Sequence, residues 1–281
     1  MKTIRTVKQM QQAARLLAAQ GKTIGVVPTM GFLHDGHLSL IRKAKQHADV
    51  VVTTIFVNPT QFGPREDLST YPRDERGDLK KIRSAGGDIV FIPTTREVYP
   101  KDFQTFVTVE KLTRILEGAS RPTHFRGVTT VVAKLFNIIR PDVAVFGMKD
   151  FQQATVLRQM TADLGYPIRF IVAPTVRERD GLAMSSRNKY FTPETRPEAV
   201  CLYRGLVTAR ALARAGERSS AKIKREMEKA ILATCPSAQI DYIAFNDLKT
   251  LAPRTTVESG TVCSLAARVH GVRLIDNLKL R

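Results

Sequence analysis

Cysteine is scarce in this sequence. Its 281 residues include three cysteines, Cys201, Cys235 and Cys263, an odd number at wide spacing. This pattern argues against a disulfide framework and against a zinc site, and it is typical of proteins from a reducing compartment. We therefore predict neither a structural disulfide nor a bound metal.

Long apolar runs are also missing. The run at 50–57 is interrupted by Thr53 and Thr54, and it is far shorter than the roughly 20 apolar residues that a membrane-spanning helix needs. The segment 1–5 is polar where a signal peptide would have an apolar core. We therefore expect a soluble, cytoplasmic protein that has no membrane partner.

Acidic residues are outnumbered: 26 Asp and Glu face 44 Lys and Arg, which gives a formal net charge of +18. A strong basic excess can indicate nucleic-acid binding. Here the basic residues are dispersed, with the densest runs at 42–45, 80–83 and 222–225, at the spacing of solvated helix faces. We favour solvated faces and an anionic small substrate, and predict no specific nucleic-acid partner; a nucleic-acid-binding protein is the alternative from another class.

The first two thirds of the chain alternate short apolar runs with amphipathic stretches. Strands are predicted at 24–27, 50–56, 89–92, 143–146 and 168–172, and helices at 6–20, 38–48, 79–85, 129–139 and 152–164. Helices between apolar, β-branched strands indicate βαβ crossovers. The pattern predicts an α/β fold with a doubly wound parallel sheet.

The pattern changes after residue 187. Helices are predicted at 196–215 and 220–233, and strands at 240–245, 262–269 and 272–274. This order predicts a smaller α+β domain. We place the domains at 1–175 and 176–281.

Chemically distinctive residues follow the predicted strands of the first domain, at 29–37, 58–63, 147–150 and 174–187. In open α/β sheets, ligands bind beyond the carboxyl ends of the strands. We therefore expect these four loops to form one ligand site.

The first of these loops combines glycine and histidine. Pro28 ends the first predicted strand, and Gly31, His34, Gly36 and His37 precede a helix. Glycines permit close approach of the backbone to a phosphate, and a helix N-terminus attracts anions. Residues three apart share a helix face, so both histidines can serve one ligand.

Four further segments, 56–73, 118–128, 146–153 and 174–188, are distinctive. Asn58 and Gln61 carry neutral amides suited to hydroxyl and carboxylate recognition. Together with the glycine–histidine segment, these blocks closely resemble the pantoate–β-alanine ligase family, within the nucleotidyltransferase superfamily that carries a His-x-Gly-His motif. The resemblance is collinear over residues 1–192.

The resemblance implies a Rossmann-like ATP-binding domain and a smaller lid domain. It also implies an ATP-dependent ligase that activates pantoate as pantoyl-adenylate, releases pyrophosphate, and transfers the acyl group to β-alanine with loss of AMP. Mg²⁺ would arrive with ATP, with Asp78 a candidate to hold it indirectly, and members are usually homodimers. Adenylation turns a poor acyl donor into a good one, so the protein must supply positioning and charge stabilisation. A cofactor adenylyltransferase of the same superfamily is the alternative.

Site roles follow from the matching positions. ATP binding is assigned to Met30, Gly31, Phe32, Leu33, His34, Asp35, Gly36, His37, Gly147, Met148, Lys149, Asp150, Val176, Met184, Ser185, Ser186 and Arg187. The catalytic set is His34, His37, Lys149, Ser185, Ser186 and Arg187. Substrate binding is assigned to Asn58, Gln61, Arg121 and Gln153. The chain departs from the family pattern at Met148, where an acidic residue is more common, and at Thr60, where leucine is.

Each motif alone has a simpler interpretation. Lys149 and Asp150 could form a surface ion pair, and the segment 185–188 could be a capping turn. His124 is interpreted as a structural loop residue. His34 and His37 lack the third ligand or H-E-x-x-H pattern of a zinc hydrolase, so we predict no metal site there.

Overall fold

The computed structural model describes residues 1–64 and 66–281, which form two compact units. The first comprises Met1–Gly147 and Val156–Pro174, and the second Met148–Thr155 and Thr175–Arg281. The predicted division at 175 and 176 therefore differs for Met148–Thr155, which join the second unit. The physical reason is local: Asn277, near the end of the chain, binds the carbonyls of Met148 and Lys149.

The first unit contains a parallel sheet of six strands. In chain order they are β1 (Lys2–Ile4), β2 (Ile24–Val27), β3 (Val50–Thr54), β4 (Ile89–Phe91), β5 (Val143–Gly147) and β6 (Arg169–Ala173). The spatial order is β1-β4-β3-β2-β5-β6, with every neighbouring pair parallel. This confirms the predicted parallel sheet and adds β1, a strand of only three residues.

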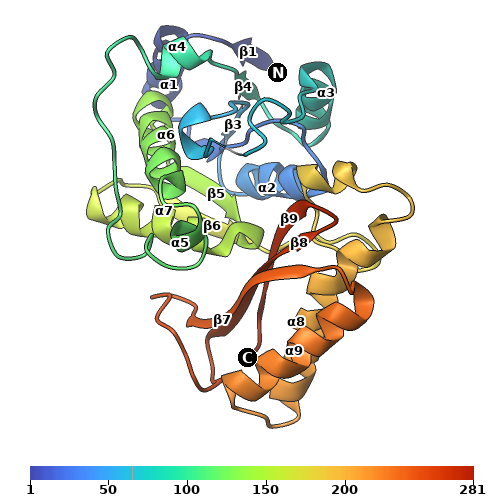
Figure 1. Ribbon diagram of the computed structural model, residues 1–281. Coiled ribbons are helices and arrows are strands. Elements are labelled where there is room, and N and C mark those ends of the chain that lie inside the picture. The colour runs from blue at the N-terminus through green and yellow to red at the C-terminus, as the bar shows by residue number, and fades with distance from the viewer. Residues whose placement is uncertain (65) are drawn as a thin grey trace. The chain divides into compact units, whose positions relative to one another are not determined.

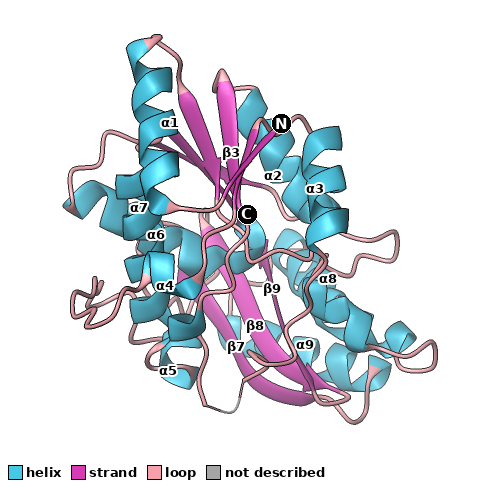
Figure 2. Cartoon of the chain, turned by 90° about the horizontal axis from the view of Figure 1, so that it is seen from above, coloured by secondary structure: helices cyan, strands magenta, loops and turns pink. Residues whose placement is uncertain are grey.

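Helices cover both faces of this sheet. The helices of this part of the chain are α1 (Val7–Ala19), α2 (Asp35–Lys45), α3 (Glu75–Ser84), α4 (Thr95–Val98), α5 (Glu117–Ser120), α6 (His124–Ile139) and α7 (Phe151–Asp163), with the 3₁₀ turn η1 (Pro59–Gln61); the first five residues of α7 belong to the second unit. Helices α1 and α6 lie on one side of the strands and α2 and α3 on the other (Figure 2). On the second side, Leu38, Ile41 and Ala44 of α2 belong to one buried cluster with Val27 and Val51 of the sheet. The doubly wound prediction is confirmed.

The strand order reverses next to β2. The chain builds β2, β3 and β4 outward on one side, then returns to place β5 on the other side of β2. The carboxyl ends of β2 and β5 therefore flank a topological switch point, where open α/β sheets bind their ligands. The loop after β2 is the glycine–histidine segment.

The second unit has helices and an antiparallel sheet (Figure 1). Its elements are η2 (Met148–Asp150), η3 (Ser186–Tyr190), η4 (Arg196–Val200), α8 (Cys201–Arg214), α9 (Ser220–Thr234), β7 (Gln239–Asp247), β8 (Thr261–Val269) and β9 (Val272–Lys279). The sheet order is β7-β8-β9. All residues of β8 except Arg268 are buried, and Cys263 and Leu265 join a core with Leu206 of α8 and Met227 of α9.

Two element bounds matter for function. Helix α2 begins at Asp35 rather than at residue 38, which puts His37 in its first turn. Strand β9 runs to Lys279 rather than to residue 274, because Asp276 and Asn277 are buried and find polar partners. Within the described residues, no helix has the length and apolar character needed to cross a bilayer.

Candidate active site

The loop between β2 and α2 is held tightly against the neighbouring strand. Thr29 donates its hydroxyl to the Thr54 carbonyl (2.6 Å), and Gly31 N–H bonds the Thr29 hydroxyl (3.2 Å). Gly31 has a φ of +84°, and a Cβ there would lie 3.0 Å from Ile55 Cγ2. The positive φ favours glycine at this turn, and a larger residue would also require Ile55 to shift slightly.

Asp78 anchors the same loop from α3. Its two oxygens accept the N–H groups of Phe32 (2.8 Å) and Leu33 (2.7 Å), while Lys81 Nζ binds the Leu33 carbonyl (2.7 Å). Asp78 is 1% exposed, and burial raises the pKa of its carboxyl. Both oxygens thus face backbone donors. This geometry gives Asp78 a structural role in holding the loop, and the indirect magnesium contact stays a prediction.

We expect Asp78→Asn to loosen this loop. An amide offers one oxygen, so its NH₂ group would face one of the two backbone N–H groups and leave it unsatisfied, at a cost of about 1–3 kcal/mol. Thermal unfolding and the KM for ATP measure the effect, and we expect a lower Tm and a higher KM. Asp74→Asn, which caps α3 through Gly77 N–H, is the matched control and should leave the KM for ATP unchanged. An unaltered KM in the Asp78 variant would contradict the anchoring role.

The two histidines lie together at the start of α2. His34 is the N-cap residue and His37 is the third residue of the helix. Their ring centroids are 4.1 Å apart, and the His34 N–H donates to His37 Nδ1 (3.3 Å). Since Nδ1 accepts, a neutral His37 ring carries its proton on Nε2. The helix N-terminus therefore offers an Nε2–H donor beside its backbone N–H groups, which suits an anion.

Asn58, after β3, organises a polar network. It is 1% exposed, and its Nδ2 donates to Gln61 Oε1 (3.1 Å) and to the Gly127 carbonyl (3.1 Å). Its Oδ1 accepts from the hydroxyls of Tyr99 (2.8 Å) and Thr60 (2.9 Å). Asn58 thereby fixes the amide orientation of Gln61.

Gln61 is further held by α6 and the turn before it. The Gln61 carbonyl accepts from Arg121 Nη2 (3.3 Å) and from His124 Nδ1 (2.9 Å), and Arg121 also forms a bidentate pair with Glu66 (2.6 Å for each bond). Burial and the Arg121 charge lower the pKa of His124 to about 4, so its ring is neutral at pH 7 and donates through Nδ1–H. A Cβ on Gly127 would collide with the Thr60 carbonyl, so glycine lets α6 approach η1 closely. Arg121, predicted as an anion contact, already has a carboxylate partner.

In the second unit, β9 holds the turn that carries Lys149. Asn277 Nδ2 donates to the carbonyls of Met148 and Lys149, both at 2.9 Å. The adjacent Asp276 is 4% exposed and forms a bidentate pair with Arg177 (2.6 and 2.9 Å). Two neighbouring residues of one strand thus position the η2 turn and the segment that follows Val176.

The serine–arginine segment follows a small antiparallel turn. Met184 N–H binds the Val176 carbonyl (3.0 Å), and Arg177 bridges to Ala183. Ser185 caps η3 by accepting the Arg187 N–H (3.2 Å). The predicted capping role of this segment is therefore present, and the side chains of Ser186 and Arg187 are half-buried rather than core residues.

The predicted site residues fall into three local groups. The glycine–histidine loop and the Gln61 network lie in the first unit, where Gln61 Nε2 also contacts Met30 Sδ (3.1 Å). Lys149, Gln153 and the serine–arginine segment lie in the second. The sequence did not indicate Tyr99 or Asn277, whose partners are distant in the chain and which belong to no local motif.

Comparison with known proteins gives full-length matches. The family described as Pantoate-beta-alanine ligase matches residues 2–279. Pantothenate synthetase from Moorella thermoacetica is 53% identical over 280 residues, covering 100% of this chain and 98% of that protein. The enzyme of the same name from Geobacter sulfurreducens is 52% identical over 280 residues, covering 100% of this chain and 99% of that protein.

Solved structures agree with the fold. Pantothenate synthetase from Thermus thermophilus has a TM-score of 0.94 at 45% identity, covering 100% of this chain and 99% of that one. Pantoate-beta-alanine ligase from Francisella tularensis, solved with β,γ-ATP and β-alanine, has a TM-score of 0.81 at 34% identity. The match covers 100% of this chain and 98% of that one. The chain therefore belongs to the pantoate–β-alanine ligase family, whose members condense pantoate with β-alanine using ATP.

Proposed function

We propose that this ligase works through pantoyl-adenylate. The pantoate carboxylate attacks the α-phosphorus of ATP and pyrophosphate leaves; the β-alanine amine then attacks the acyl carbon and AMP leaves. The observation that carries the proposal is the His37 geometry. An Nε2–H donor at the N-terminus of α2, fixed by the Nδ1 contact, supports a role for His37 in stabilising negative charge on a phosphate.

The remaining charge stabilisation is assigned to residues of the second unit. Lys149 supplies a cation, held through its own backbone carbonyl, while Ser185, Ser186 and Arg187 supply hydroxyl and guanidinium donors. The other proposed ATP contacts are Met30 to Asp35, Gly36, Gly147, Met148, Asp150, Val176 and Met184. Mg²⁺ is proposed to enter bound to the ATP phosphates, as this ion usually does.

A covalent acyl-enzyme is not part of the proposal. The three cysteines are all buried, and burial raises the pKa of Cys201 to about 12 and that of Cys263 as well. Such thiols are protonated at pH 7 and are poor nucleophiles. Ser185 Oγ accepts an N–H bond within its own turn and serves as a cap. These features support an adenylate rather than an ester or thioester.

We place pantoate at Gln61 and Gln153. Gln61 is half-buried and its Oε1 is already held by Asn58, so its NH₂ group is oriented to donate. Asn58 and Arg121 are proposed to act through Gln61, because Asn58 is fully engaged and Arg121 binds both Glu66 and the Gln61 carbonyl. Tyr99 joins Asn58 in this supporting role.

We expect Gln61→Ala and Gln153→Ala to raise the KM for pantoate far more than that for ATP. Each removes a hydrogen-bond partner from a polar substrate, at about 1–3 kcal/mol, or roughly 5- to 150-fold. Steady-state kinetics with each substrate varied in turn measure the difference. Gln159→Ala, an exposed glutamine on the same helix as Gln153, is the matched control. A selective rise in the KM for ATP would remove the glutamine concerned from the pantoate site.

Product analysis tests the proposed reaction. With ATP, Mg²⁺, pantoate and β-alanine, we expect one AMP and one pyrophosphate for each pantothenate. A product that retains the adenylyl group, with no free AMP, would instead identify the cofactor adenylyltransferase. A homodimer, a cytoplasmic location and the lid function of the second unit stay predictions.

A further inference from the structure

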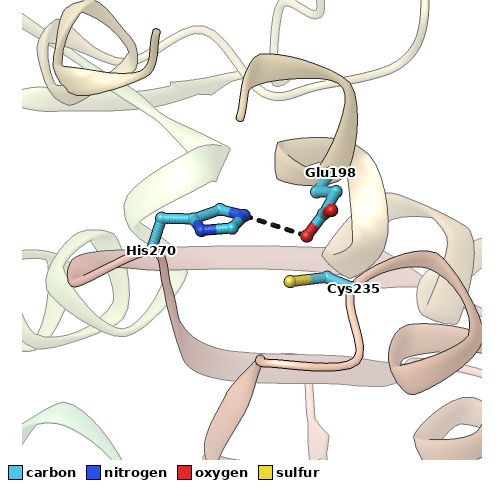
Figure 3. A group of neighbouring side chains, drawn as sticks. All are labelled: Glu198, Cys235 and His270. Carbon is cyan, nitrogen blue, oxygen red and sulfur yellow. Dashed lines mark hydrogen bonds and ion pairs between the residues drawn. The ribbon is translucent and has the colours of Figure 1, made fainter. Parts of the chain in front are cut away.

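Three side chains of the second unit, far apart in the sequence, lie close together (Figure 3). Glu198 lies in η4, Cys235 is the C-cap of α9, and His270 lies in the turn between β8 and β9. They bring together a carboxylate, a thiol and an imidazole. The proposed ligase mechanism uses none of the three.

The three donor atoms lie close enough together for a single ion to contact all of them after small side-chain shifts. One ligand atom from each residue lies within 4.8 Å of the other two, and His270 Nε2 is 2.9 Å from Glu198 Oε2. Zinc with bonds of about 2.0–2.3 Å and tetrahedral angles holds its donors about 3.3–3.6 Å apart. Shifts of about an ångström, within the reach of side-chain rotation at Glu198 and His270, would convert one arrangement into the other.

The backbone fixes the histidine at this point. Val269 pairs with Val272, so His270 and Gly271 form a two-residue hairpin turn with φ values of 48° and 80°. Such turns favour asparagine, aspartate or glycine at their first position. A histidine there projects its ring from a rigid turn toward Glu198, as Figure 3 shows.

One of the three residues is buried and the other two are partly exposed, so an ion could reach the cluster from solvent. Cys235 is fully buried, whereas the side chains of His270 and Glu198 are 31% and 36% exposed. The thiol is thus the buried member of the cluster, and the His270 and Glu198 side chains lie at the surface. A fourth position would be filled by water, as in zinc sites with three protein ligands.

We propose that Glu198, Cys235 and His270 bind a zinc ion. A thiolate with imidazole is the ligand combination that zinc accepts and that magnesium and calcium do not favour. The sequence argued against a zinc site because the cysteines are isolated; the fold supplies the missing proximity. The metal would tie η4, the end of α9 and the β8–β9 turn together.

The electrostatics are consistent with exchange of a proton for the metal. Burial raises the pKa of the Cys235 thiol and the Glu198 carboxylate raises it further, so the thiol keeps its proton when no cation is present. Zinc binding releases that proton, because the thiolate is the form that binds the metal. The thiolate and the Glu198 carboxylate then balance the two charges of the ion.

Metal titration of the full-length chain, stripped with a chelator and free of ATP, tests the proposal. We expect one equivalent of Zn²⁺ to bind and to raise the Tm, and Co²⁺ to give a thiolate-to-cobalt charge-transfer band in the near ultraviolet. Cys235→Ala should abolish that band. It should also weaken Zn²⁺ binding by at least about 100-fold, because even loss of an outer-shell partner costs roughly 10- to 100-fold.

Matched variants keep the result interpretable. Cys263→Ala removes a buried thiol of the same unit that lies in β8 and is not in the cluster, and it should bind Zn²⁺ as the parent does. His270→Asn retains a residue that tolerates the positive φ, so the turn survives while a ligand is lost, and its zinc affinity should fall as in Cys235→Ala. Absence of stoichiometric Zn²⁺ binding in the parent would overturn the proposal. A zinc affinity equal to that of the parent in either the Cys235 or the His270 variant would also overturn it.

Discussion

Replacement of His37 by alanine should lower kcat by about 10²–10³, the effect of losing one preorganised donor to a developing charge. The structural reason is the tautomer of the His37 ring, which carries its proton on Nε2. His37 Nδ1 is occupied by the His34 N–H, which leaves Nε2–H as the donor at the helix N-terminus. Rapid-quench measurement of pyrophosphate release in the first turnover reports the adenylation step directly.

His47→Ala is the matched control, because His47 lies just beyond the opposite end of α2. We expect kcat near that of the parent for this variant. Circular dichroism should show that the His37 variant is folded, since its ring is half-buried and outside the core. A folded His37 variant with nearly normal adenylation would exclude this residue from the catalytic set.

Loss of Lys149 should have an effect of similar size, about 10²–10³ in kcat for Lys149→Ala, because it removes a cation from the developing phosphate charge. Lys249→Ala, at an exposed position of the same unit, should be neutral. The same first-turnover experiment measures both variants. A small change in kcat with a large rise in the KM for ATP would show that Lys149 binds the ground state instead.

Asn277 is expected to affect the same step by positioning Lys149. Its amide holds the carbonyls of Met148 and Lys149, so Asn277→Ala should lower kcat without removing any charged group. In the Lys149→Ala background the same change should add little, because the residue being positioned is already gone. Full additivity of the two effects would mean that Asn277 acts by another route.

Much of the fold was predictable because each strand is marked by its own residues. The run Val50–Thr54 is β-branched throughout, and all of its residues except Val50 are buried, as expected for a strand between two helical layers. β1 escaped prediction because three residues carry too short a pattern. The start of α2 was placed three residues late because the glycine at 36 suggested a loop, whereas the histidines provide the helix N-terminus.

The parts of the site that are local in sequence were also predictable. The glycine–histidine loop and the Asn58–Gln61 pair are contiguous motifs, and the structure holds each in one place. Their supports were not predictable in the same way. Asp78 is an ordinary acidic residue in a helix pattern, yet it fixes a loop more than 40 residues away.

Contacts between residues that are distant in the sequence could not be predicted from local sequence patterns. Asn277 reaches residues 128 and 129 positions earlier, and His270 meets Glu198 across 72 positions. The partners share no spacing or periodicity, so the contact is fixed only when β9 and η4 are in place. The isolated cysteine at 235 illustrates this most clearly: sequence spacing argued against a metal site, and the fold supplies the two other ligands.

Isotope exchange between pyrophosphate and ATP tests whether pantoyl-adenylate forms and stays bound to the protein without a covalent link. With ATP, Mg²⁺ and pantoate but no β-alanine, we expect labelled pyrophosphate to enter ATP. We expect no exchange when pantoate is omitted. Exchange without pantoate, or no exchange in a preparation that still forms pantothenate, would contradict the adenylate mechanism.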